Sequence, residues 1–207
     1  MNEVKLKKAQ AQFFENFPGG FAHPEMIKIG KKHKMDKMVE FAQEAFSRNA
    51  CQKVAQTCDH MIKLVSRSSM VSMFEKPKFR DFIQSLNDSD KSFLVDALDN
   101  LLHGKQQVGF EAMVDLLKTA KLAKWSLVSI IPAYYQPTTE VFVKPTTAKN
   151  VIRFFEVEQL IYKPTPTWAF YQAYRDLINQ MKRQCDKSLS PSNAAFSGFL
   201  MMSMPHS

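Results

Sequence analysis

The segment from Lys121 to Glu156 is the one part of this chain that departs from the pattern of amphipathic helices. Elsewhere, apolar residues recur at spacings of three and four, which is typical of helices with one buried face. The clearest case is residues 87–104, where acidic residues precede an apolar run that His103 and Gly104 end. The sequence therefore predicts a mainly α-helical, globular bundle of about eight or nine helices.

Within that segment, the sequence favours a small β element. Residues 140–144, EVFVK, alternate in side-chain type and are bounded by threonines and a proline, as in a short strand. The preceding run, residues 125–132, has no polar face, so its periodicity does not separate a helix from a buried strand. We expect the two runs to pair as a ribbon over about residues 125–144.

The length of 207 residues and the absence of an internal repeat favour one domain over residues 1–207. The alternative is a division at the polar stretch Ser66–Ser69. That division would give an N-terminal helical unit, 1–68, and a C-terminal unit, 69–207, that carries the β element.

The cysteines and the N-terminus indicate a compartment. Cys51, Cys58 and Cys185 form no CxxC pair, which favours free thiols in a reducing environment. The charged N-terminus lacks the apolar core of an export signal, and no window approaches ~18 consecutive apolar residues. We therefore expect a cytoplasmic protein without a membrane span.

A net charge of +8 favours anionic partners. The sharpest local feature is the motif KPTTAK, residues 144–149, at the predicted start of a helix. A helix start exposes unpaired N–H groups and a partial positive charge, so it can hold a phosphate or carboxylate. In the alternative interpretation, Thr146 or Thr147 caps the helix and the lysines are simply solvated.

The surroundings of this motif are basic and aromatic. Positions 118 to 163 contain seven Lys and Arg residues but only three glutamates. The same stretch contains the aromatic residues Trp125, Tyr134, Tyr135 and Tyr162. Cations for phosphates and aromatic rings for bases are what single-stranded nucleic-acid binders combine. No named nucleic-acid motif accompanies them. The predicted contacts to a nucleic acid or other polyanion are Lys144, Thr146, Thr147, Lys149, Arg153 and Lys124.

A second basic cluster occupies residues 28–37. Closely spaced charged residues usually lie on the solvent-exposed side of a helix and bind nothing. If the two clusters shared one surface, however, they would form a continuous basic face.

Seventeen Phe and twelve Met residues support an alternative function. Such residues first of all fill a core, but they also form adaptable docking surfaces. The alternative is thus a helical regulatory or interaction protein, and the apolar run 194–204 is its best docking candidate.

Catalytic and metal-binding signatures are missing from the sequence. The five histidines include no HExxH motif, and no glycine-rich nucleotide loop is present. Acidic groups such as Asp96 with Asp99 fit solvated helix faces. We expect no catalytic residue, metal or cofactor, and a protein that is not an enzyme. An enzyme would need a site assembled from distant residues, such as His23, His33 or Glu140.

Overall fold

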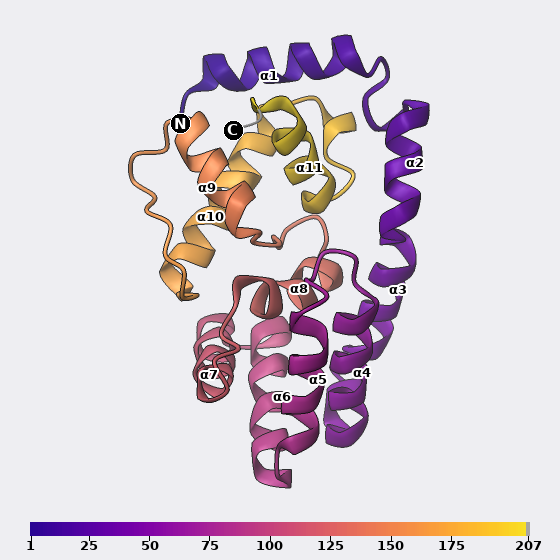
Figure 1. The fold of residues 1–207 in the computed structure, drawn as a ribbon, viewed down its shortest axis with the longest axis vertical. Coiled ribbons are helices and arrows are strands. Elements are labelled where there is room, and N and C mark those ends of the chain that lie inside the picture. Colours follow the sequence, from indigo (N-terminus) through magenta and orange to yellow (C-terminus); the bar gives the residue numbers. More distant parts are fainter. Residues whose placement is uncertain (206–207) are drawn as a thin grey trace.

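The computed structural model describes residues 1–205 and confirms a mainly helical protein (Figure 1). Short 3-10 turns, η1 (Gly20–Ala22), η2 (Ala50–Gln52) and η3 (Lys187–Leu189), connect some of the helices. The α-helices are α1 (Glu3–Asn16), α2 (Pro24–His33), α3 (Met35–Ala45), α4 (Val54–Arg67), α5 (Glu75–Ser85), α6 (Asp88–His103), α7 (Gln106–Thr119), α8 (Trp125–Tyr135), α9 (Pro145–Phe154), α10 (Trp168–Arg183) and α11 (Asn193–Ser203).

Helix α8 occupies the first half of the predicted β element. Every residue from 127 to 134 is buried, including Pro132 inside the helix. A helix that is buried on all sides has no polar face. Its sequence therefore lacks the alternation of polar and apolar residues that marks a helix. The prediction of a β element over residues 125–144 is therefore wrong in its first half.

The second half is an extended segment without a strand partner. The Val143 N–H donates to Ser129 Oγ at 3.0 Å, and the Glu140 carbonyl accepts from Asn193 Nδ2 at 3.0 Å. Side chains thus satisfy the backbone groups that a neighbouring strand would otherwise bond. No residue from 1 to 205 is in a β-strand, so the predicted strand at 140–144 is also wrong.

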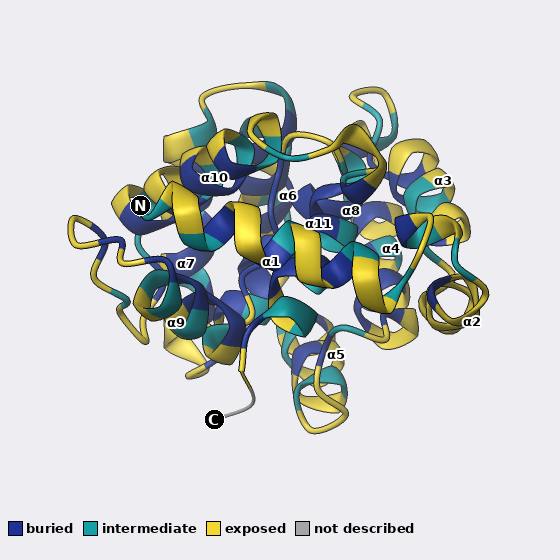
Figure 2. Ribbon diagram, turned by 90° about the horizontal axis from the view of Figure 1, so that it is seen from above, coloured by how far each residue is buried: buried dark blue, intermediate teal, exposed yellow. Residues whose placement is uncertain are grey.

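The helices form two groups that meet at α8 (Figure 1). Helix α1 lies across one end, over α9, α10 and α11, and α4 to α7 form the other end. Helix α2 runs along one edge and links the two groups. Seen from above, α1 turns its buried side toward α11 and its exposed side to solvent (Figure 2). The buried apolar side chains form one cluster that extends from Leu6 to Met204.

An aromatic corner closes the end of α1. The rings of Phe17 and Phe21 lie 5.1 and 5.7 Å from the ring of Phe13, and Gly19 takes a left-handed φ of 84° at the turn. Phe21 therefore folds back on the helix that it follows. Phe199 of α11 contacts Phe13 from the other side, at 5.2 Å.

Candidate functional site

Helix α9 begins where the sequence predicts, at Pro145. Its N-cap residue is Lys144, whose backbone is extended and whose side chain makes no capping hydrogen bond. Neither Thr146 nor Thr147 is the N-cap, so the capping interpretation of these threonines is wrong. The N–H groups of the first turn therefore lack the side-chain acceptor that usually satisfies one of them.

The predicted contact residues of α9 divide between two sides of the helix. Thr146, Lys149 and Arg153 are exposed, and their spacings of three and four place them on one side. Thr147 is only 7% exposed and lies on the inner side. The structure thus groups three of these residues and separates Thr147 from them.

Tertiary contacts bring two further lysines to α9. The Trp125 indole N–H donates to the Lys163 carbonyl at 2.7 Å, which ties the segment that carries Lys163 to the residue that follows Lys124. The Lys149 ammonium lies 4.9 Å from the centre of the half-buried Tyr162 ring. The segment of Tyr162 and Lys163 thus contacts both α9 and the start of α8. We call this set the α9 basic surface: Lys124, Lys144, Thr146, Lys149, Arg153 and Lys163.

The aromatic residues that the sequence places near this surface have different environments. Trp125 is 1% exposed and Tyr134 is fully buried, so both rings belong to the core and are closed to a ligand. Tyr162 is half-buried and remains accessible in part. Tyr135 is also half-buried, but its ring packs against His103, at 5.2 Å, so Tyr162 is the partly accessible ring that contacts α9.

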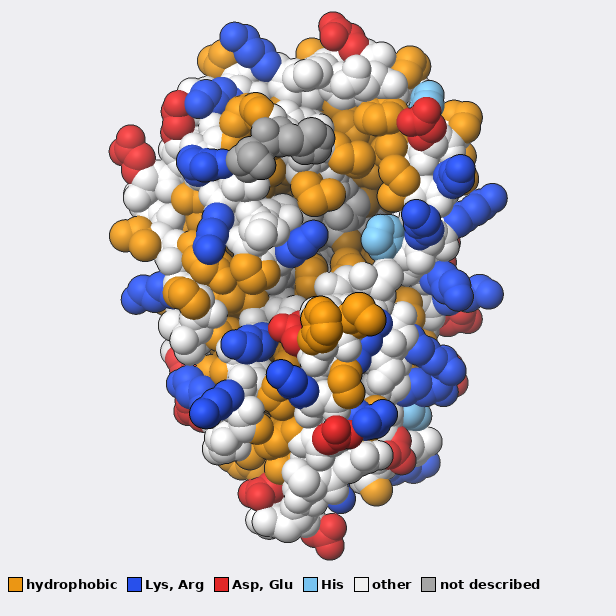
Figure 3. Space-filling model, in the orientation of Figure 1, with side chains coloured by type: hydrophobic (Ala, Val, Ile, Leu, Met, Phe, Trp, Pro, Cys, Tyr) orange, Lys and Arg blue, Asp and Glu red, His pale blue; other side chains and the backbone are white. Residues whose placement is uncertain are grey.

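The second basic cluster lies on α2 and the start of α3, and Met26 is the buried residue of α2. Helices α2 and α9 lie at opposite edges of the molecule in both ribbon views (Figures 1 and 2). Basic side chains are spread over the face in Figure 3, with apolar and uncharged ones between them. The two clusters are therefore separate patches.

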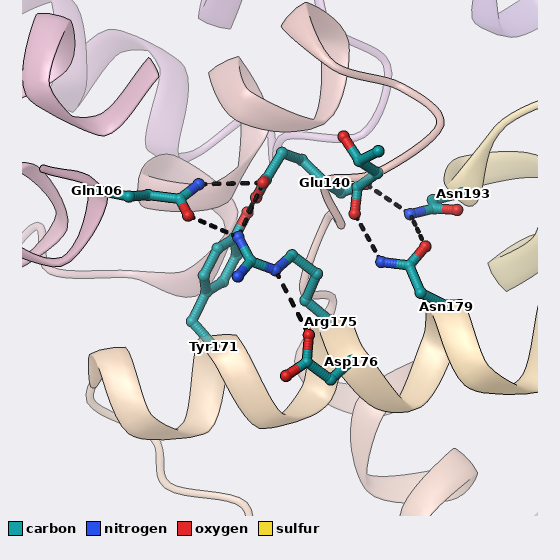
Figure 4. A network of polar contacts seen from close by, with 8 residues as sticks. Gln106, Glu140, Tyr171, Arg175, Asp176, Asn179 and Asn193 are labelled. Carbon is teal, nitrogen blue, oxygen red and sulfur yellow. Dashed lines mark hydrogen bonds and ion pairs between the residues drawn. The ribbon is translucent and has the colours of Figure 1, made fainter. Parts of the chain in front are cut away.

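A buried ion pair lies between the two groups of helices (Figure 4). Glu140 is 5% exposed, and its Oε1 accepts from Arg175 Nη1 at 2.8 Å and from Gln106 Nε2 at 3.0 Å. The Tyr171 hydroxyl donates to Oε2 at 2.6 Å. Burial, followed by the neighbouring Glu140 carboxylate, raises the pKa of Tyr171 well above its ordinary value. Both carboxylate oxygens are satisfied, so this glutamate ties α7 to α10.

Two asparagines extend this network to α11 (Figure 4). Asn193 Nδ2 donates to the Glu140 carbonyl at 3.0 Å and to Asn179 Oδ1 at 3.2 Å. Asn179 in turn donates to the Thr139 carbonyl at 2.8 Å. The segment that follows α8 is thus held by side chains of α10 and α11.

The histidines near these features have structural bonds. His23 accepts from the Glu25 N–H at the start of α2, and His33 Nδ1 bonds Ser69 Oγ at 2.8 Å. Neither bonds Glu140 in the part of the chain from 1 to 205, and His206 lies outside the described residues. The structure therefore does not join His23, His33 and Glu140 through hydrogen bonds.

One cluster offers three metal-ligating side chains. A sulfur, a carboxylate oxygen and a ring nitrogen from Cys51, Asp99 and His103 all lie within 4.8 Å of one another. Asp99 Oδ1 is buried and has no hydrogen-bond partner among residues 1–205. The prediction that Asp99 belongs to a solvated helix face is therefore wrong for this oxygen. Sequence reasoning missed the cluster because Cys51 comes from a different element, η2, than the two residues of α6.

The C-terminal apolar run forms core. Phe196, Phe199 and Leu200 of α11 are fully buried. Their aromatic surface is occupied within the molecule and is closed to a partner. Two neighbouring large apolar side chains are instead exposed between α4 and α5, namely Met73 and Phe74, each 74% exposed.

Comparison with protein-family models, curated proteins and solved structures finds no match to this chain. In the described part of the chain, no helix combines the length and the apolar character needed to cross a membrane.

Proposed function

We propose that this protein is a non-enzymatic module that binds nucleic acid, as a single strand, on the α9 basic surface. The observation that carries the proposal is the Lys149 ammonium, 4.9 Å from the centre of the partly accessible Tyr162 ring. The exposed Lys163 follows that ring in the chain, and its carbonyl accepts from the indole of Trp125, which follows the exposed Lys124. Ammonium groups neutralise backbone phosphates, and an aromatic ring stacks on a base without requiring a particular sequence.

The start of α9 adds a fixed anion-binding element to these lysines. The first-turn N–H groups lack a side-chain cap and carry the positive end of the helix dipole. Lys144 and Thr146 flank them and are exposed. A phosphate at this point would accept from backbone donors while lysines on either side neutralise its neighbours.

The acidic residue next to the end of α9 is largely neutralised. The Glu156 carboxylate accepts from Lys5 Nζ at 2.7 Å and from Asn2 Nδ2 at 2.7 Å. The hydrogen bond from Lys5, above all, lowers the pKa of Glu156. Its charge is therefore offset locally, and it opposes a polyanion less than a free carboxylate would.

The expected result is salt-sensitive binding that depends on this surface. The logarithm of the association constant for a labelled oligonucleotide should fall with log salt, by about 0.7 per phosphate contact on a single strand. The triple variant Lys124→Ala/Lys149→Ala/Lys163→Ala should flatten that slope by about 2 and weaken binding at low salt. Fluorescence anisotropy over a series of salt concentrations measures both quantities.

A matched control removes the same charge from the other patch. Lys31→Ala/Lys32→Ala/Lys37→Ala alters exposed residues of α2 and α3 and should leave the slope close to wild type. Tyr162→Ala should weaken binding to an oligonucleotide but not to inorganic polyphosphate, which has no bases to stack. Equal losses in both triple variants, or no binding at low salt, would reject the proposal.

The exposed pair Met73 and Phe74 favours a second candidate, a helical interaction protein. Two adjacent apolar side chains held 74% exposed are typical of a small protein-docking point. The variant Met73→Ser/Phe74→Ser should lose a protein partner that wild type retains in crosslinking and mass spectrometry, with unchanged folding stability. Identical recovered partners would count against this candidate. The three free cysteines support a reducing compartment, such as the cytoplasm, for either function.

A further inference from the structure

We propose that Cys51, Asp99 and His103 form a binding site for a divalent transition-metal ion, and that zinc is the ion that these donors fit best. Their ligand atoms lie within 4.8 Å of one another. Donors about 2.0–2.3 Å from a tetrahedral zinc ion lie about 3.3–3.8 Å apart. Small side-chain rotations therefore suffice to close the three atoms around an ion.

The positions of the three residues follow from two elements. Asp99 and His103 are four residues apart on α6, so their side chains emerge on one side of the helix, one turn apart. Cys51 lies on η2, which follows the end of α3. A thiolate, an imidazole and a carboxylate together form a donor set that zinc prefers, whereas calcium and magnesium require oxygen ligands.

The Phe46 carbonyl provides an outer contact of the kind found at metal sites. It accepts from His103 Nε2 at 2.8 Å and from Cys51 Sγ at 3.6 Å. A histidine that donates one ring N–H to a backbone carbonyl keeps a lone pair on its other nitrogen, and this is how ligating histidines are usually oriented. The carbonyl thus orients His103, whereas its contact with Cys51 exists only while the thiol keeps its proton.

The carboxylate of Asp99 gives independent evidence for a cation. Its Oδ1 is buried and has no hydrogen-bond partner in the described chain, and it is the one such side-chain atom among residues 1–205. An unpaired buried oxygen is costly, and a bound cation would satisfy it. Metal binding would release the Cys51 thiol proton to solvent, because zinc binds the thiolate.

The same three residue types could suggest a thiol nucleophile, but the geometry disfavours it. Cys51 is only 5% exposed, and its thiol is directed at the Phe46 carbonyl rather than at His103. A nucleophilic cysteine needs an accessible sulfur with a lowered pKa, and Cys51 has the opposite properties. Three protein ligands leave a fourth coordination position, which water can fill.

The test uses the full chain after removal of metal with a chelator. Titration with Co²⁺ should give one bound ion per chain and a thiolate-to-cobalt charge-transfer band, which Zn²⁺ should abolish by displacement. Cys51→Ser should remove the band, and Asp99→Asn and His103→Gln should each weaken binding more than about tenfold, since loss of an outer contact alone has that effect. Cys58→Ser is the matched control, because Cys58 is also a buried free thiol but lies on α4.

Asp99→Asn also separates metal binding from a purely structural role. Without metal, the variant should melt at the same or a higher temperature than wild type, because it removes a buried charge that has no partner. With saturating Zn²⁺, wild type should gain the larger increase in melting temperature. Absence of the cobalt band in wild type, or equal metal affinities of wild type and Asp99→Asn, would overturn the proposal.

Discussion

Glu140→Ala is expected to lower the free energy of unfolding by about 3–5 kcal/mol, the range found when one partner of a buried ion pair is removed. The variant leaves the Arg175 guanidinium, whose side chain is 15% exposed, without its carboxylate. Gln106 and the Tyr171 hydroxyl lose their acceptor at the same time. The large effect thus comes from buried groups left without partners more than from the attraction itself.

Urea denaturation of wild type and variant measures this difference. Asp176→Ala is the matched control, because Asp176 also lies near Arg175, at 4.0 Å, but its side chain is 68% exposed. An exposed pair of this kind is worth at most about 1 kcal/mol. If Glu140→Ala unfolded within 1 kcal/mol of wild type, as the control should, the network of Figure 4 would not hold the two groups of helices together.

The helices are predictable because most of them have one solvent-exposed polar face. That face gives the sequence a helical period. Helix α6 shows this well, since its acidic first turn, apolar stripe and final Gly104 all indicate the same element. The same reasoning does not predict helix α8, and the cause is physical. It is surrounded by other helices, so no polar residues mark its period, and the extended segment after it resembles a strand in composition.

The sequence predicts the part of the α9 basic surface that depends on neighbouring residues. It does not predict the part that depends on contacts between distant residues. The start of α9 follows from Pro145 and the residues around it, which depend only on neighbouring positions. The link between the segment of Lys163 and the start of α8 depends on the indole of Trp125, a contact across 38 residues. Whether an aromatic ring stacks on a ligand or fills the core is likewise decided by packing, and Trp125 does the latter.

The proposed metal site likewise combines residues that are close in the sequence with one residue that is distant. Asp99 and His103 have a readable four-residue spacing, but a carboxylate and an imidazole one turn apart are common on solvated helices. Cys51 becomes a third donor only because η2 folds against the end of α6. A motif search requires all donors at fixed spacings, so it detects no site that is completed by a distant element.

Gly109→Ala is expected to destabilise the protein by about 3 kcal/mol or more, at or beyond the upper end of the usual cost of overpacking. A Cβ atom at Gly109 would lie 2.3 Å from the Leu101 nitrogen and 2.4 Å from the Ala97 carbonyl oxygen. Both atoms belong to the backbone of α6, so no side-chain rotation relieves the clash and α6 and α7 must separate. Alanine normally stabilises a helix interior relative to glycine by about 1 kcal/mol, so the sign of the effect is reversed here.

Gly198→Ala in α11 provides the matched control, because a Cβ there meets no atom within 4 Å. It should stabilise the protein by roughly 0.5–1 kcal/mol, the ordinary advantage of alanine in a helix. Thermal and urea unfolding of both variants test the prediction, and a stabilised Gly109→Ala protein would show that α6 and α7 are not in backbone contact. Gln106 begins α7 one turn before Gly109, so separating the helices should also weaken its bond to Glu140. The double variant Gly109→Ala/Glu140→Ala should then lose less free energy of unfolding than the two single variants lose in total. Each single variant already disrupts part of the same contact.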